Sequence, residues 1–261
     1  MKVAVTGKGG VGKTTVCALL AQAFARAGRR VLAVDADPNA TLAACLGFPD
    51  ADTITPLSEM AELIEERTGV KPGTSGAMFK LNPRVDDIPE RFAVEHNGIR
   101  LLRMGAIKSG GSGCYCPENA FLKSLVSHLL LAEQDVMIMD MEAGVEHLGR
   151  ATAQGADWLL IVVEPSRQSV ETAKRIQALA GDIGLTRLGV VGNKCRDDRE
   201  RDFILKSVAP MPLLGVIPYD DALRRAEVEG RPPHFDLPEA DHTVRLIMRN
   251  LIEKTGPEGP G

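Results

Sequence analysis

The chain begins with a glycine-rich loop that stands between an apolar run and a helical pattern. Residues 7–14 read GKGGVGKT and match the pattern G-x-x-x-x-G-K-T in full. The apolar run Lys2–Thr6 precedes this loop, and apolar residues at helical spacing follow it over Lys13–Ala27. Strand, loop and helix in this order are typical of a phosphate-binding loop, in which backbone N–H groups and the helix N-terminus hold phosphate oxygens. We therefore expect an α/β fold that binds a nucleotide.

The side chains of the loop indicate how the nucleotide would be held. Lys13 is expected to neutralise the β- and γ-phosphates, and the Thr14 hydroxyl to ligate Mg²⁺. A second lysine, Lys8, marks the deviant loop of the family that includes MinD, ParA and the nitrogenase iron protein. In that family it crosses a dimer interface and touches the partner's nucleotide; the alternative is a solvated loop lysine. The predicted nucleotide contacts in the loop are Gly9, Gly10, Val11, Gly12, Lys13, Thr14 and Thr15.

The remainder of the chain alternates apolar runs with helical patterns. Most of the runs are continuous rather than alternating, as in strands covered on both faces. This organisation predicts a doubly wound, mostly parallel sheet with helices on both faces. The expected strands are Lys2–Thr6, Val31–Asp35, Val136–Asp140, Trp158–Val163, Leu188–Gly192 and Leu213–Ile217, and the expected helices are Lys13–Ala27, Ala120–Leu131, Gln168–Ile183, Glu200–Val208 and Asp241–Glu253.

Residues 47–98 interrupt this alternation. The runs Phe92–Glu95 and Ile99–Arg103 flank Asn97-Gly98, which is a strong signal for a β-hairpin. We interpret it as one antiparallel strand attached to the parallel sheet, with a loop insertion as the alternative. A short helix is expected near Leu57–Arg67. The chain is expected to form one domain over residues 1–255, followed by a disordered tail at 256–261.

Two acids and one amide follow predicted strands, at the sheet edge where α/β proteins bind ligands. By resemblance to the MinD and ParA family, Asp37 positions or deprotonates the attacking water, and Asp140 holds Mg²⁺ through water. Glu142 is open between catalysis, a dimer contact and a surface acid. Asn193 starts an N-K-C-R sequence that lacks the aspartate with which N-K-x-D proteins read guanine, so ATP is the expected nucleotide. Asn193 and Pro218 are the predicted contacts beyond the loop.

A Cys-x-Cys pair, Cys114 and Cys116, precedes a predicted helix. Pro117 suits the first helical position, which places Cys116 at the N-cap, where the helix dipole favours the thiolate. Two thiolates bind a soft metal incompletely, because closed sites usually have four ligands, and a two-fold dimer axis would supply the other two. The alternative is a pair of small residues that opens a helix.

Three segments together resemble the CooC family of ATPases, which assist nickel insertion into carbon monoxide dehydrogenase. They read GCYCPENA at 113–120, DMEAGVEH at 140–147 and FKLNP at 79–83, and the resemblance extends from Lys2 to about Ile252. It implies an ATP-driven homodimer that binds nickel, or zinc, between paired Cys-x-Cys motifs and serves the apo dehydrogenase. The implied metal ligands are Cys114 and Cys116, and the implied ATPase residues are Lys8, Lys13, Thr14, Asp37 and Asp140.

Composition restricts the other possibilities. The net charge of −4 argues against a nucleic-acid partner, and no apolar run approaches the length of a membrane helix, so no stable membrane association is expected. Five cysteines, an odd number, suit a reducing compartment, and we expect a cytoplasmic protein. The alternatives are an ATP-dependent iron–sulfur electron-transfer or cluster-carrier protein, a ParA- or MinD-like positioning switch, and a maturation factor for acetyl-CoA synthase.

Overall fold

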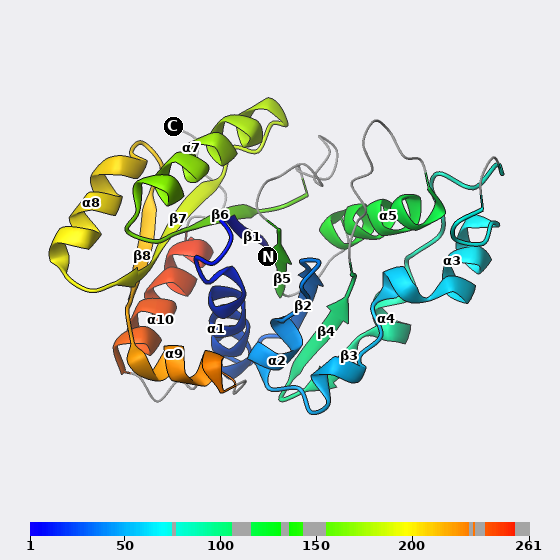
Figure 1. The fold of residues 1–261 in the computed structure, drawn as a ribbon, viewed down its shortest axis with the longest axis horizontal. Coiled ribbons are helices and arrows are strands. Elements are labelled where there is room, and N and C mark those ends of the chain that lie inside the picture. The colour runs from blue at the N-terminus through cyan, green and yellow to red at the C-terminus, as the bar shows by residue number, and fades with distance from the viewer. Residues whose placement is uncertain are drawn as a thin grey trace.

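The computed structural model describes residues 1–74, 77–105, 116–131, 136–142, 155–229, 232 and 238–253. The described residues form one eight-stranded sheet in the order β3-β4-β2-β5-β1-β6-β7-β8 (Figure 1). All neighbouring strands are parallel except the β3–β4 pair. The strands are β1 (Lys2–Gly7), β2 (Val31–Ala36), β3 (Val94–His96), β4 (Ile99–Arg103), β5 (Val136–Met141), β6 (Trp158–Val163), β7 (Leu188–Cys195) and β8 (Leu213–Pro218).

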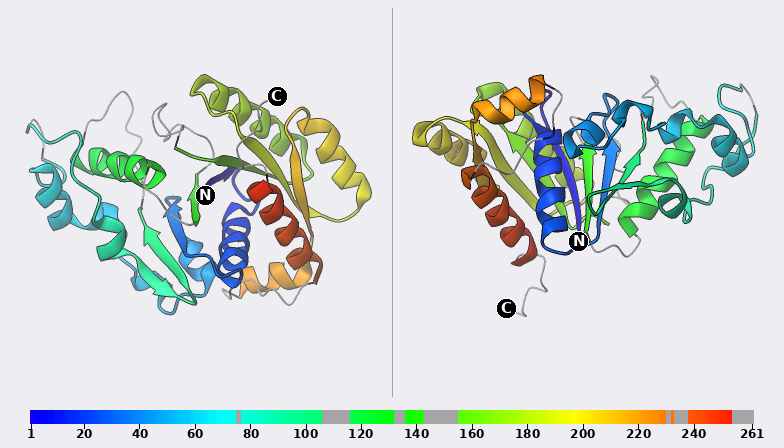
Figure 2. Two further views of the ribbon diagram at one scale, coloured as in Figure 1. Left: turned by 180° about the vertical axis from the view of Figure 1, so that it is seen from behind. Right: turned by 90° about the horizontal axis from the view of Figure 1, so that it is seen from below.

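Helices cover both faces of the sheet, which confirms the predicted doubly wound fold (Figures 1 and 2). Successive strand residues point to opposite faces, so Val3 and Ala4 belong to two different apolar cores. The core on one side includes α3, α5, α7 and α8, and the core on the other includes α1, α2 and α10. The helices are α1 (Lys13–Arg26), α2 (Leu42–Leu46), α3 (Ala61–Thr68), α4 (Ile88–Phe92), α5 (Pro117–Leu131), α7 (Arg167–Asp182), α8 (Asp198–Val208), α9 (Asp221–Val228) and α10 (Pro238–Glu253).

The predicted hairpin is present, with a shifted first strand. Asn97 and Gly98 both have positive φ values, 50° and 74°, as a tight two-residue turn between antiparallel strands requires. The expected strand at Phe92–Glu95 is displaced to Val94–His96, because α4 continues through Phe92. Among the described strands, β3 alone is antiparallel to the rest of the sheet, since β4 pairs in parallel with β2.

Several helical segments differ from the prediction. The expected helix at Leu57–Arg67 is a 3₁₀ turn over Leu57–Glu59 followed by α3, and α2, α4 and α9 were not predicted. These three missed helices each have eight residues or fewer, too short to show a repeated apolar period. The proposed tail at 256–261 lies outside the described residues.

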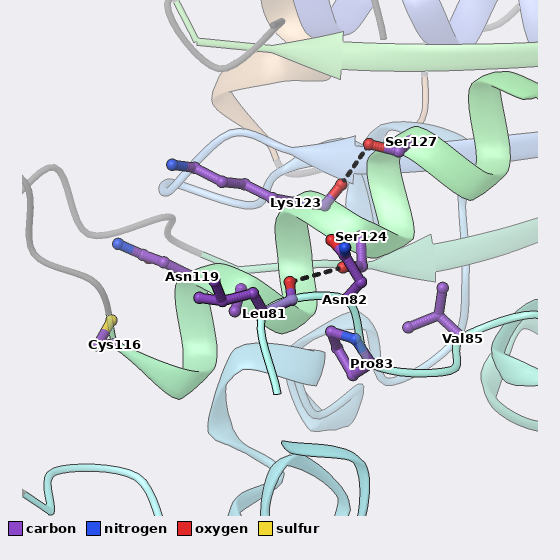
Figure 3. A pocket seen from close by; sticks show the side chains of 10 residues that line it. Leu81, Asn82, Pro83, Val85, Cys116, Asn119, Lys123, Ser124 and Ser127 are labelled. Carbon is purple, nitrogen blue, oxygen red and sulfur yellow. Dashed lines mark hydrogen bonds between the residues drawn. The ribbon is translucent and has the colours of Figure 1, made fainter. Parts of the chain in front are cut away.

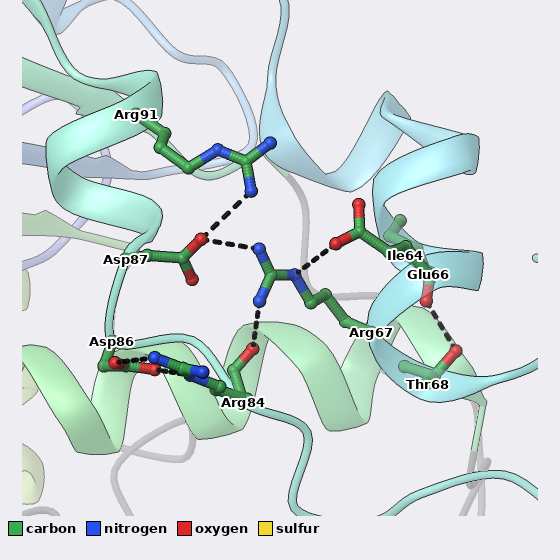
Figure 4. A network of polar contacts seen from close by, with 8 residues as sticks. All are labelled: Ile64, Glu66, Arg67, Thr68, Arg84, Asp86, Asp87 and Arg91. Carbon is green, nitrogen blue, oxygen red and sulfur yellow. Dashed lines mark hydrogen bonds and ion pairs between the residues drawn. The ribbon is translucent and has the colours of Figure 1, made fainter.

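An ion-pair network ties α3 to the start of α4 (Figure 4). Arg67 on α3, only 9% exposed at its side chain, donates to Asp87 at 2.7 Å, and Arg91 donates to the same oxygen at 3.0 Å. Hydrogen bonds from Arg67 and Arg91 lower the pKa of Asp87 to about 2. Arg67 also lies 3.5 Å from the carbonyl oxygen of Arg84. Arg67 on α3 and Arg91 on α4 therefore hold residues 84–87 in place.

Candidate functional site

The glycine-rich loop joins β1 to α1 in a conformation that only glycine supplies readily. Gly10 and Gly12 have φ values of 81° and 91°, in the left-handed region. A Cβ on Gly7 would lie 2.5 Å from the carbonyl oxygen of Val162 on β6, so the loop also leaves the sheet through a position with no space for a side chain. Gly12 is the N-cap of α1 and has no side chain to cap the first turn, and that turn contains no acid. The helix N-terminus is therefore available to an anion.

Thr14 and Asp140 lie together although 126 residues separate them in the chain. The Thr14 hydroxyl donates to Asp140 Oδ2 at 2.6 Å, and Asp140 is fully buried at the end of β5. Burial raises the pKa of Asp140 to about 6; Asp37 acts in the same direction, while the hydrogen bond from Thr14 and the charge of Lys13 oppose the shift. Lys13 is itself 8% exposed. The side chains predicted to hold phosphate and Mg²⁺ are thus brought close to one another.

A second buried carboxylate, Asp35, lies next to Asp140 and was missed by the sequence analysis. The two residues are register partners on the adjacent strands β2 and β5. Burial raises the pKa of Asp35 to about 7, and the neighbouring Asp140 adds to the shift. One oxygen of Asp35 accepts the backbone N–H of Leu42 at 3.1 Å. The D-x-D spacing of Asp35 and Asp37 at the end of a buried strand is the signal that could have identified it.

These groups fit a hard divalent cation. The Oδ1 atoms of Asp35 and Asp140 are buried and have no hydrogen-bond partner among the described residues. Two adjacent buried carboxylates are costly without a compensating positive charge. Carboxylate and hydroxyl oxygens are the ligands that Mg²⁺ accepts. The arrangement of Thr14 and the two acids is therefore compatible with the expected magnesium ion.

Asp37 lies just beyond β2 and is held by its own turn. The backbone N–H and the side-chain amide of Asn39 donate to Asp37 Oδ1 at 2.9 and 3.1 Å. This Asx turn orients the carboxylate, which is 9% exposed. Because Asp37 raises the pKa of Asp140, the two carboxylates share one electrostatic environment. The structure thus brings Asp37 to the same edge as Thr14 and Asp140.

Lys8 contacts an acid of its own chain in this structure. Its Nζ lies 3.8 Å from Glu164 Oε1, and both side chains are partly exposed, at 34% and 27%. An exposed ion pair at this distance contributes about 1 kcal/mol or less. Lys8 can therefore leave Glu164 at little cost.

The residues expected near the base lie at the ends of β7 and β8. Asn193 is 5% exposed, and its side-chain amide donates to the loop carbonyl of Val11 at 2.8 Å. Pro218 ends β8 and is the register partner of Cys195. The next residues stack, with the Arg196 guanidinium 3.9 Å from the centre of the Tyr219 ring. Asn193 is thus committed to the loop through its donor atoms.

Cys116 directly precedes α5, as its pattern predicted. Its carbonyl accepts the N–H of Ala120 at 3.1 Å, and α5 starts at Pro117. Cys114 lies outside the described residues. Within the described part of the chain, no three His, Cys, Asp or Glu side chains are grouped so that they could hold a metal ion. The structure therefore places Cys116 at a helix N-terminus.

A pocket of about 430 Å³ lies beside Cys116 (Figure 3). One wall is a stripe along α5 that includes Cys116, Asn119 and Lys123, and the opposite wall is the segment Leu81–Val85. That segment contains part of the FKLNP motif and leads into the ion-pair network around Arg67. Two separate motifs of the family resemblance therefore meet at one pocket.

The other described cysteines have different surroundings. Cys17 is fully buried in α1, and its burial, together with the charge of Asp140, raises the pKa of its thiol. Cys195 is 5% exposed, and burial raises the pKa of its thiol to about 11. Cys45 is half-buried. Cys17 and Cys195 are thus held as thiols inside the fold.

No helix in the described part of the chain combines the length and the apolar character needed to cross a bilayer.

Comparisons with known proteins identify the family of the chain. Residues 2–233 match the family model "CobQ/CobB/MinD/ParA nucleotide binding domain". The chain is 44% identical over 259 residues to the carbon monoxide dehydrogenase accessory protein CooC of Rhodospirillum rubrum, with 98% of each chain covered. It is 47% identical over 256 residues to an uncharacterized ATP-binding protein of Methanocaldococcus jannaschii, covering 97% of this chain and 98% of the relative.

Solved structures support the fold. A chain of the MinC:MinD cell division protein complex of Aquifex aeolicus matches with a TM-score of 0.68 at 22% identity, over 99% of this chain and 98% of that one. MinD of Pyrococcus horikoshii, solved with Mg-ADP, matches with a TM-score of 0.63 at 19% identity, over 99% and 98%. With the full-length similarity to CooC, these findings show that the chain belongs to the CobQ/CobB/MinD/ParA nucleotide-binding domain family and, within it, to the CooC type.

Proposed function

We propose that this chain is a cytoplasmic ATP-hydrolysing maturation factor that assists nickel insertion into carbon monoxide dehydrogenase. It acts as an ATP-dependent homodimer and carries nickel, or zinc, between the Cys114 and Cys116 thiolates of two subunits. The observation that carries the proposal is the 44% identity to CooC over 98% of both chains. The position of Cys116 at the start of α5 supports it, as does the absence of disulfides among the described cysteines.

The nucleotide is held by the loop and its neighbours. Residues 9–15 supply backbone N–H groups to the phosphates, and Lys13 neutralises their charge. The Thr14 hydroxyl and the Asp140 carboxylate would hold Mg²⁺, which supplies positive charge to the phosphate oxygens when bound. Asn193 donates its amide N–H to Val11, so its oxygen is the atom left for the base. An acceptor pairs with the exocyclic amine of adenine and repels O6 of guanine, which favours ATP over GTP.

Hydrolysis then needs an oriented water. The turn with Asn39 orients the Asp37 carboxylate. This carboxylate accepts a proton from the water while the water oxygen attacks the γ-phosphorus. The bond between the γ-phosphorus and the bridging oxygen breaks, and ADP and phosphate are the products. Lys8 leaves Glu164 and reaches the nucleotide of the partner subunit, where it stabilises the charge of the transition state. Activity therefore depends on dimer formation.

The metal ion is the cargo of this cycle. The N-terminus of α5 carries the partial positive charge of the helix dipole, which stabilises a thiolate at Cys116. Each subunit offers two thiolates, and a dimer offers four, which is the coordination number that soft divalent ions commonly reach. ATP hydrolysis loosens the dimer, alters the cysteine geometry and releases nickel to the client enzyme.

The test combines equilibrium dialysis against nickel with light scattering, with and without a non-hydrolysable ATP analogue. We expect one tightly bound nickel ion per dimer, lost in Cys114→Ser and in Cys116→Ser. Cys45→Ser, which changes a half-buried cysteine elsewhere, is the matched control and should keep the metal. One tight nickel ion per monomer without dimer formation would overturn the shared site.

A second experiment tests the client enzyme. Nickel-dependent activation of apo carbon monoxide dehydrogenase by this protein and ATP is the expected result, and activation of apo acetyl-CoA synthase instead would overturn that assignment.

A further inference from the structure

The C-terminal end of β7 departs from regular strand geometry next to the glycine-rich loop. The register between β7 and β8 shifts between Gly192 and Cys195. Within this shift, Lys194 has a φ of 61°, in a left-handed region that residues other than glycine rarely adopt. Irregularities of this kind re-aim side chains and are concentrated near functional sites. Here the two residues of the irregularity, Asn193 and Lys194, both point at the loop.

Their side chains bind two successive carbonyl groups of the loop. Lys194 Nζ donates to the carbonyl oxygen of Gly10 at 2.7 Å, and Asn193 Nδ2 donates to that of Val11 at 2.8 Å. Both contacts join segments more than 180 residues apart in the chain. The fit is close, since a Cβ on Gly12 would lie 2.3 Å from Asn193 Nδ2 and 3.8 Å from Lys194 Cε. The loop therefore rests directly on these two side chains.

Holding a carbonyl also fixes the N–H group of the same peptide unit. In a planar trans peptide, C=O and N–H point in opposite directions. The bond from Lys194 to Gly10 thus directs the N–H of Val11 away from Lys194, and the bond from Asn193 to Val11 directs the N–H of Gly12 away from Asn193. The N–H of Val11 lies a long 3.4 Å from the carbonyl oxygen of Lys8, a weak contact that a phosphate oxygen can replace.

We infer that Asn193 and Lys194 are positioning residues that preset the glycine-rich loop for phosphate. They turn two acceptor oxygens away from the anion and two N–H donors toward it before the nucleotide arrives. The ammonium group of Lys194 also adds positive charge beside the loop. The inference rests on the proposed nucleotide binding, and it gives the N-K pair a role in phosphate binding that is separate from reading the base.

The test compares the binding of ligands that contain phosphate groups with the binding of a ligand that lacks them. Lys194→Met removes one donor and one charge, while Lys206→Met on α8 removes the charge of a lysine that pairs with Asp202 instead of the loop and serves as the matched control. Binding of inorganic tripolyphosphate, ATP and adenosine is measured by calorimetry, adenosine by displacement. Loss of one charge-assisted hydrogen bond predicts about tenfold weaker binding of tripolyphosphate and of ATP. Adenosine binding should not change.

Three further readouts separate positioning from a structural role. The thermal midpoint of the ligand-free Lys194→Met protein should match that of Lys206→Met. The KM for ATP should rise about tenfold with kcat changed less, and Lys194→Arg, which keeps a donor and the charge, should recover part of the loss. Asn193→Ser is the second variant: it should also weaken tripolyphosphate binding, and it should weaken adenosine binding as well, because it removes the amide oxygen proposed to contact the base.

The outcomes distinguish this inference from the proposed function. Wild-type affinity of Lys194→Met for tripolyphosphate, or an equal loss for adenosine and ATP, would overturn the inference while the wild-type protein still hydrolyses ATP. Failure of the wild-type protein to bind or hydrolyse ATP would instead overturn the proposed function.

Discussion

Asp140→Asn tests the electrostatics of the site in the protein free of metal and nucleotide. Asp140 is fully buried beside Asp35, and its pKa is raised from 3.8 to about 6, chiefly by burial. A shift of about 2 pKa units corresponds to about 3 kcal/mol of cost for the ionised carboxylate at neutral pH. The amide of Asn has no charge and can donate a hydrogen bond to Asp35, although imperfect hydrogen bonding of the amide costs about 1 kcal/mol of stability. The variant should therefore be about 1–3 kcal/mol more stable than the wild type at pH 7.5.

The pH dependence identifies the cause. An acid with a raised pKa binds more protons in the folded than in the unfolded chain, so the wild type loses stability as pH rises from about 4 to about 6. Asp140→Asn lacks this contribution. Its advantage should be small at pH 4, grow through that window and stay level above about pH 7.

Urea unfolding followed by circular dichroism at pH 4.5 and 7.5 provides the measurement. Asp202→Asn, at a carboxylate that is 61% exposed on α8, is the control and should change stability by about 0.5 kcal/mol or less. With Mg²⁺ and ATP present, the wild type should gain stability and the variant should lose hydrolysis. A variant that is less stable at pH 7.5, or equally altered at both pH values, would refute the electrostatic reasoning.

Two lysine variants test the remaining roles in the loop. Lys13→Ala should abolish ATP hydrolysis and keep the fold, since Lys13 acts on phosphates; unchanged turnover would contradict the assignment of the loop. Lys8→Ala should still bind nucleotide, because the ion pair that it loses is with Glu164, which lies outside the loop. The variant should lose the ATPase activity that depends on dimer formation, which is measured as the increase of turnover with protein concentration. Normal dimer formation together with normal turnover in that variant would argue against the cross-subunit role.

The sequence predicted the parts of the site that depend on local pattern. The loop, the strands that end in Asp140 and near Asp37, and the start of α5 at Pro117 all follow from motifs or from periodicity over a few residues. Proline suits the first helical position because its missing N–H has no partner there, so the N-cap position of Cys116 was predictable.

The contacts that the sequence did not predict join distant segments. Asp35 and Asp140 become neighbours only through the strand order, in which β2 pairs with β5 rather than with β1. Asn193 was assigned to the base from its resemblance to a known motif, whereas its amide binds Val11 because the end of β7 is irregular. Local pattern carries no information on either point, since strand order and strand irregularity are set by tertiary packing.

Chain topology explains how a cysteine at residue 116 and an acid at residue 140 come to the same edge of the molecule. The helix α5 ends at Leu131 and β5 begins at Val136, so the short connection makes the helix run antiparallel to the strand that follows it. A helix of 15 residues is about 22 Å long and a strand of 6 residues about 20 Å, so the two elements match in length. The N-terminus of α5 therefore lies at the carboxyl end of β5. The two elements also share one apolar core, in which Leu125 and Met139 are both buried. The order of α5 and β5 along the chain therefore brings Cys116 and Asp140 to the same edge of the sheet.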